Sequence, residues 1–163
     1  MAKRISLYAM FTACALIFSY IEALFSLNFI APGVKLGLAN CVAMLLLLKG
    51  HTKGAFLVNV ARILISCLLF SVPTTLIFSL SAGICSLVLI WALSKTKIFS
   101  PVGLCAAGGA VHNIVQILVA IFFTGTIGVV YLLPILLICG TLCGVLTGFI
   151  SVFADKYLKR FNF

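Results

Sequence analysis

Residues 54–93 read GAFLVNVARILISCLLFSVPTTLIFSLSAGICSLVLIWAL, and this stretch decides the fold class. It holds one charged residue, Arg62, and Pro73 divides it into two apolar runs. Each run comes close to the roughly 20 residues that a helix needs to cross about 30 Å of hydrocarbon. Because proline lacks the N–H that a continuing helix requires, we predict two membrane-spanning helices joined by a tight hairpin.

Further apolar runs extend this pattern over the rest of the chain. The six predicted spans cover residues 5–27, 32–48, 54–72, 74–93, 101–123 and 128–154. The second is the shortest, and it spans better if Pro32 takes the first helical position, where no N–H is needed. The sixth is long, and we expect Pro134 to kink it. These patterns predict an all-α membrane protein, a six-transmembrane-helix bundle, with residues 1–163 forming one polytopic domain.

The composition excludes most soluble classes of protein. Of the 163 residues, 64% are hydrophobic and 8% are charged, whereas a soluble domain has about 45–50% apolar and about 25% charged residues. So few charges cannot cover a water-facing surface, which excludes a soluble enzyme and a disordered chain. The net charge of +9 would suggest a nucleic-acid binder. However, the 11 basic residues, apart from Arg62, lie between apolar runs rather than along one face, so we predict no nucleic-acid partner.

Chemistry at a catalytic or metal site is limited by the side chains available. The acidic residues are Glu22 and Asp155 alone. A pair of catalytic carboxylates, an Asp-rich magnesium site and a Ser-His-Asp triad all need acids that are not available together here. The seven cysteines lie inside apolar runs and form no C-x-x-C pair. We therefore predict no catalytic residue, no metal site and no cofactor.

The basic residues predict the orientation in the membrane. Nine of them fall on one side of the predicted spans: Lys3, Arg4, Lys49, Lys53, Lys95, Lys97, Lys156, Lys159 and Arg160. The connections on the other side carry Lys35 alone. The positive-inside rule then places both termini in the cytoplasm. A cleaved signal peptide is the alternative for the start of the chain, but the apolar run is too long and no A-x-A site follows it.

Several polar residues fall within or beside the spans, where a charge costs at least about 2.5–3.5 kcal/mol. The predicted site residues are Glu22, Lys35, Asn40, Arg62, His112, Asn113 and Gln116. Their expected depths converge on a pocket that opens toward the outside, and its net charge of +1 favours a small anionic solute as ligand. The alternative is an interhelical clamp in which Glu22 pairs with Arg62 and the amides join helices. Lys35 could instead extend to outer lipid phosphates.

Small residues at a spacing of four form a second pattern. Gly140, Gly144 and Gly148 repeat on the sixth predicted helix, and Ala9 and Ala13 have the same spacing on the first. Such stripes let helices approach closely. We assign the glycines to helix packing, and we assign the two alanines to docking of a partner for the reason given below.

Four segments carry a resemblance to a known family. They are Pro-Gly-Val-Lys-Leu-Gly-Leu-Ala-Asn (32–40), Arg62 in its helix, Ala-Gly-Gly-Ala-Val-His-Asn-Ile-Val-Gln (107–116), and Leu-Pro followed by the glycine stripe. Over nearly its whole length the chain resembles the bacterial membrane family called Gx transporter, also labelled heptaprenyl diphosphate synthase component I. This resemblance implies a multi-pass protein of the bacterial cytoplasmic membrane, surrounded by membrane lipid.

That family is in turn similar to the substrate-binding S components of energy-coupling-factor transporters. The similarity implies six helices, an outward pocket roofed by residues 28–35, and a coupling subunit docked on Ala9 and Ala13. It also implies partner ATPases, because the chain has no G-x-x-x-x-G-K-[ST] loop with which to hydrolyse ATP itself. The function expected on this basis is capture and passage of a small, anionic solute.

The synthase label implies a different function, prenyl elongation for menaquinone side chains. Prenyl synthases hold magnesium and diphosphate with Asp-Asp-x-x-Asp motifs, and this chain has one aspartate, Asp155. The alternative to transport is therefore a non-catalytic accessory subunit associated with a prenyl diphosphate synthase. A membrane scaffold without a ligand is the third possibility.

Overall fold

A computed structural model describes residues 2–24, 37, 39–70 and 74–158, and this part of the chain folds into helices without strands. The α-helices are α1 (Ala2–Leu24), α2 (Asn40–Leu48), α3 (Thr52–Phe70), α4 (Thr74–Thr96), α5 (Pro101–Thr124) and α6 (Leu133–Leu158), with a 3-10 helix η2 (Ile127–Leu132) before α6. Among these residues, five helical segments are long and apolar enough to cross a membrane. The chain is therefore an all-α protein with several helices of membrane-spanning length.

The second predicted span differs most from the structure. The helix found there, α2, has 9 residues, and at a rise of 1.5 Å per residue it extends about 14 Å. It does not cross a bilayer alone. Apart from Gly37 and Ala39, the remainder of the predicted span and the predicted lid, residues 28–35, lie outside the described residues.

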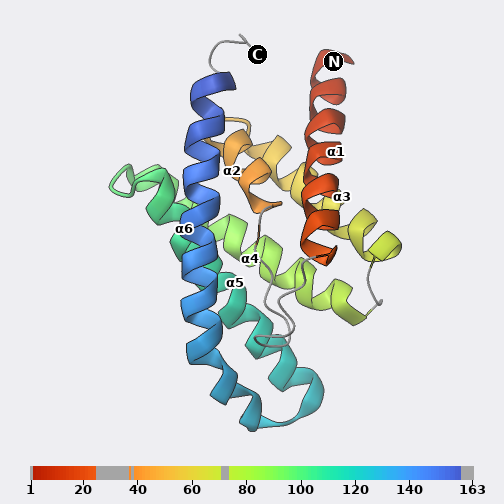
Figure 1. Cartoon of the computed structure of the whole chain (residues 1–163), viewed down its shortest axis with the longest axis vertical. Helices are drawn as coiled ribbons and strands as arrows, with labels where there is room; N and C mark the ends of the chain where they lie inside the picture. Colours follow the sequence, from red (N-terminus) through yellow and green to blue (C-terminus); the bar gives the residue numbers. More distant parts are fainter. Residues whose placement is uncertain (1, 25–36, 38, 71–73, 159–163) are drawn as a thin grey trace.

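The helices form one bundle whose elements alternate in direction (Figure 1). The N-terminal end of α1, the turn between α2 and α3 and the C-terminal end of α6 lie toward one end, and the connection from α5 to α6 lies at the other. Lys49 Nζ lies 3.4 Å from Asp155 Oδ1, which ties the end of α2 to the last turns of α6. The aromatic rings of Tyr8 and His51 lie 6.4 Å apart at the same end. The start of α1, the start of α3 with Lys53, and the end of α6 with Lys156 thus lie at the same end of the bundle as Lys49.

Helix α5 lies between α4 and α6, and its ends follow from the sequence. Ser100 Oγ accepts a hydrogen bond from the Gly103 N–H at 3.1 Å, and Pro101 fills the first helical position. Gly125 closes the helix in the left-handed conformation, with φ of 63°. Pro134, which we expected to kink the last span, is the second residue of α6. Its missing N–H is not needed there, so it marks the start of that helix.

The seam between α5 and α6 is formed by the glycine stripe Gly140, Gly144 and Gly148. A Cβ placed on Gly144 would lie 2.8 Å from the Cα of Ala106, and one on Gly148 would lie 2.7 Å from the Cα of Val102. Real Cβ atoms essentially never approach so closely. The two helix backbones are therefore in direct contact, which requires glycine along this line.

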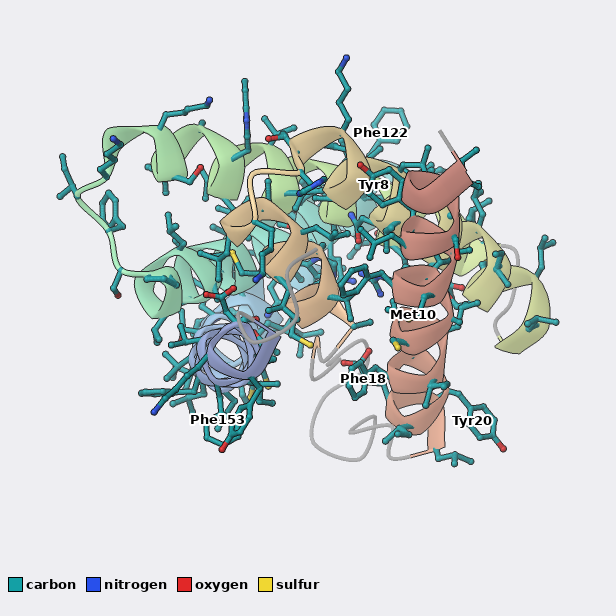
Figure 2. All side chains as sticks on the ribbon, turned by 90° about the horizontal axis from the view of Figure 1, so that it is seen from above. Tyr8, Met10, Phe18, Tyr20, Phe122 and Phe153 are labelled. Atoms are coloured by element: carbon teal, nitrogen blue, oxygen red, sulfur yellow. The ribbon has the colours of Figure 1, made fainter. Side chains whose placement is uncertain are left out.

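Side-chain exposure divides α1 into two faces. Ala15 is fully buried, and Phe18 packs against the core that it shares with α2 and α3. Figure 2 shows Phe18 on the side of α1 that faces the other helices, whereas Tyr20 of α1 and Phe153 of α6 project away from the bundle. Large apolar side chains on the outside are the normal surface of a protein solvated by lipid tails.

Candidate functional site

Arg62 is the charged residue at the centre of the described polar network. It lies on α3 and is 9% exposed. Its Nε and Nη2 atoms donate to Asn59 Oδ1 at 3.2 and 2.9 Å, and Nη2 also donates to Asn40 Oδ1 of α2 at 2.5 Å. Asn59 Nδ2 in turn donates to the Gly83 carbonyl of α4 at 3.1 Å. One guanidinium and two amides thus connect α2, α3 and α4.

The amide oxygens accept from Nε and Nη2 of the guanidinium but carry no net charge. The negative charge comes from Glu22, which interacts electrostatically with Arg62. Glu22 is half-buried on α1 and acts in the same way on Cys143 of α6. A carboxylate from α1 therefore places a negative charge within electrostatic range of the buried guanidinium.

A cavity of about 50 Å³ lies beside this network, among the start of α2 and helices α4, α5 and α6. Its polar side chains belong to Asn40, Ser86, His112, Asn113 and Thr147, and the remaining lining is mostly glycine and cysteine. A water molecule needs about 10–15 Å³ of such volume. The cavity is therefore large enough for a few water molecules and polar enough to hold them.

The polar residues of α5, His112, Asn113 and Gln116, have two functions within the bundle. Asn113 is buried, and its Nδ2 donates to the Leu136 carbonyl of α6 at 2.5 Å, which joins the two helices by a side-chain bond. Gln116 Nε2 lies 3.2 Å from His112 Nε2, one turn along the same helix. His112 also lines the cavity, so this pair places a titratable imidazole at the cavity wall.

The structure brings most of the predicted site residues into one connected set. Glu22 acts on Arg62, Arg62 bonds to Asn40, and Asn40 shares a cavity with His112 and Asn113. Gln116 joins through His112. Lys35 lies outside the described residues. A ligand-binding role for this set remains a prediction, because the same bonds also serve as connections between helices.

Both predicted small-residue patterns fall on described helices. Ala9 and Ala13 are exposed on α1, so both side chains are accessible on the face that we assigned to a partner. The glycine stripe instead faces α5 within the bundle. Partner docking on the two alanines remains a prediction.

Three contributors to the site lie outside the list of predicted site residues. Asn59 was recognisable, because it lies three residues before Arg62 and therefore on the same face of the helix. Ser86 and Thr147 gave no signal, because hydroxyl residues in apolar helices usually bond to their own backbone. Both do so here, to the Gly83 and Gly144 carbonyls, and they line the cavity as well.

The fold and this interior define a polytopic helical membrane protein with a polar core. Its sequence matches the family described as heptaprenyl diphosphate synthase component I over residues 11–154, and the chain belongs to that family. This finding confirms the predicted resemblance to component I. No curated protein and no solved structure matches the chain.

Proposed function

We propose that this chain is a non-catalytic membrane component that associates with a prenyl diphosphate synthase. The observation that carries the proposal is the family match over residues 11–154. The description of that family names a component of a heptaprenyl diphosphate synthase. A component without catalytic residues of its own agrees with the scarcity of carboxylates in this chain.

The chemistry of the chain supports a non-catalytic role. Prenyl transfer needs several carboxylates to hold magnesium and a diphosphate, and the whole chain has Glu22 and Asp155. Asp155 pairs with Lys49, and Glu22 acts on Arg62. The cavity of about 50 Å³ also fits water rather than a prenyl diphosphate. Catalysis would then belong to the partner subunit.

The charge distribution supports contact with a soluble partner on one side of the membrane. The end of the bundle that carries Lys49, Lys53 and Lys156 faces the cytoplasm in this proposal, as the positive-inside rule requires. A cytoplasmic synthase can reach this end. Its long prenyl product is apolar and has to enter the same membrane that holds this chain.

Deletion of the coding sequence tests this function through the quinones of the host cell. We expect quinones with shortened side chains or in reduced amount, and restoration by the intact chain supplied in trans. Mass spectrometry of extracted lipids measures both quantities. Quinones of normal length and amount in the deletion strain would eliminate the accessory role.

Capture of a small anionic solute is the second candidate, and the convergence of Asn40, His112 and Asn113 on one cavity favours it. Arg62, together with Lys35, would meet the negative charge, and the amides would orient the ligand. Thermal-shift screening of purified protein against carboxylates and phosphates tests this idea. A stabilising solute whose effect disappears in Arg62→Gln supports it, whereas unchanged affinity in that variant leaves Arg62 as a clamp only.

A further inference from the structure

The turn between α4 and α5 combines exposed lysines with exposed apolar side chains. All residues from 95 to 100 are exposed. Lys95 and Lys97 contribute charge, while Ile98 is 80% exposed and Phe99 is 48% exposed. Trp91 lies one turn earlier on α4 and is 38% exposed. Cations beside aromatic and aliphatic groups are typical of the boundary between lipid headgroups and acyl chains.

The turn is short and held in a fixed shape. Lys97 adopts a left-handed conformation with φ of 56°, which is uncommon for a residue other than glycine. Ser100 and Pro101 then start α5 at once through the N-cap bond to Gly103. Ile98 and Phe99 lie between these two features, and both are exposed in this conformation.

The position of the turn indicates what covers it. Figures 1 and 2 both place it at the lateral edge of the bundle, away from α1. Lipid surrounds the sides of a membrane-spanning bundle, so a lateral position favours lipid over a cytoplasmic protein docked on the end face as the group that covers this turn. Lys95 Nζ lies 5.6 Å from the centre of the Trp91 ring, so charge and aromatic surface occupy the same place.

The charge of the turn is not neutralised by the carboxylates of the chain. Asp155 pairs with Lys49, and Glu22 acts on Arg62 in the interior. The connection at the opposite end of the bundle, residues 124–132, is similarly apolar and exposed, with Ile127 at 75%, but has no charged residue. Two lysines thus distinguish this turn from a merely apolar one.

We propose that the α4–α5 turn is a binding site for anionic phospholipid, in which Lys95 and Lys97 hold the phosphate headgroup and Ile98 and Phe99 enter the adjacent acyl region. Each lysine near the surface should favour an anionic over a neutral lipid by about five-fold. Added salt should weaken this preference.

Trp91 provides a built-in probe, because it is the single tryptophan of the chain. The full-length protein is reconstituted in phosphatidylcholine vesicles that contain equal fractions of brominated phosphatidylglycerol or brominated phosphatidylcholine. We expect stronger quenching of Trp91 fluorescence by the brominated anionic lipid. Lys95→Gln/Lys97→Gln should remove the difference while quenching by brominated phosphatidylcholine persists, which shows that the variant is inserted and folded.

Lys53→Gln/Lys156→Gln is the matched control, because it removes two other exposed lysines and should keep the wild-type preference. Equal quenching of wild type by both lipids would overturn the proposal, and so would a preference that survives in Lys95→Gln/Lys97→Gln. Equal quenching together with a change in Trp91 emission on addition of farnesyl diphosphate would assign the turn to a prenyl diphosphate instead.

Discussion

Between α5 and α6 the contact is made by backbone against backbone, along Gly140, Gly144 and Gly148. Among α2, α3 and α4 it is made by side chains, through a buried guanidinium and two amides. The first seam depends on close packing, which needs no polar group and tolerates no extra atom. The second depends on a charge that is costly to bury, so removal of any member leaves the others unsatisfied. The two seams should therefore respond differently to substitution.

The largest effect is expected at the second seam, where the Arg62 guanidinium joins α2, α3 and α4. Arg62→Met should lower the free energy of unfolding by about 3–5 kcal/mol, because it leaves the amide oxygens of Asn40 and buried Asn59 without their donor. It also removes the positive charge that acts on half-buried Glu22. Thermal unfolding of the detergent-solubilised protein measures the loss. Lys53→Met, at an exposed position, is the control and should change stability by less than about 0.5 kcal/mol.

A double substitution sharpens this prediction. Glu22→Gln in the background of Arg62→Met removes the carboxylate charge that Arg62 no longer offsets and should restore part of the lost stability. If the double variant is no more stable than Arg62→Met, the attraction between these two residues is not what holds the seam.

The glycine seam between α5 and α6 should lose less stability on substitution. Gly144→Ala adds one methyl group against the α5 backbone, and overpacking of this kind costs about 1–3 kcal/mol. Gly128→Ala is the matched control, because the nearest heavy atom to a Cβ there is 3.6 Å away. Equal unfolding temperatures for the two alanine variants would contradict direct backbone contact at Gly144.

The smallest effect is expected for the hydrogen bond that the Asn113 side chain makes from α5 to α6. Asn113→Leu removes the donor to the Leu136 carbonyl, and a hydrogen bond between helices in a membrane contributes about 0.6 kcal/mol on average. Asn59→Leu should cost more, because Asn59 bonds to both Gly83 and Arg62. Unfolding measurements on the two variants give the ranking, and the reverse order would show that the seams differ less than we infer.

Apolar run length predicted the central helices well. The predicted spans 54–72, 74–93 and 101–123 correspond to α3, α4 and α5, because sustained hydrophobicity, Ser100 and Pro101 are local signals. The predicted second span was less accurate, since its described helix starts only at Asn40. Composition marks an apolar run but not the residue at which a helix within it begins.

The site was predictable in its membership but not in its connections. A polar residue in an apolar run is conspicuous, and Arg62, Asn40 and Asn113 were identified in this way. The bonds that join these helices also use backbone groups: Asn59 donates to the Gly83 carbonyl and Asn113 to the Leu136 carbonyl. Every residue has a carbonyl, so no sequence pattern marks these two. The angles at which the helices cross decide which carbonyl is reached, and those angles depend on packing along the whole bundle.

Affinity purification of the tagged chain from gently solubilised host membranes, after cross-linking through lysine, tests the proposed association most directly. We predict that mass spectrometry recovers a prenyl diphosphate synthase, cross-linked to the lysine-bearing end of the bundle at Lys53 or Lys156. Recovery of transport ATPases without a synthase, or of no synthase at all, would contradict the proposed function.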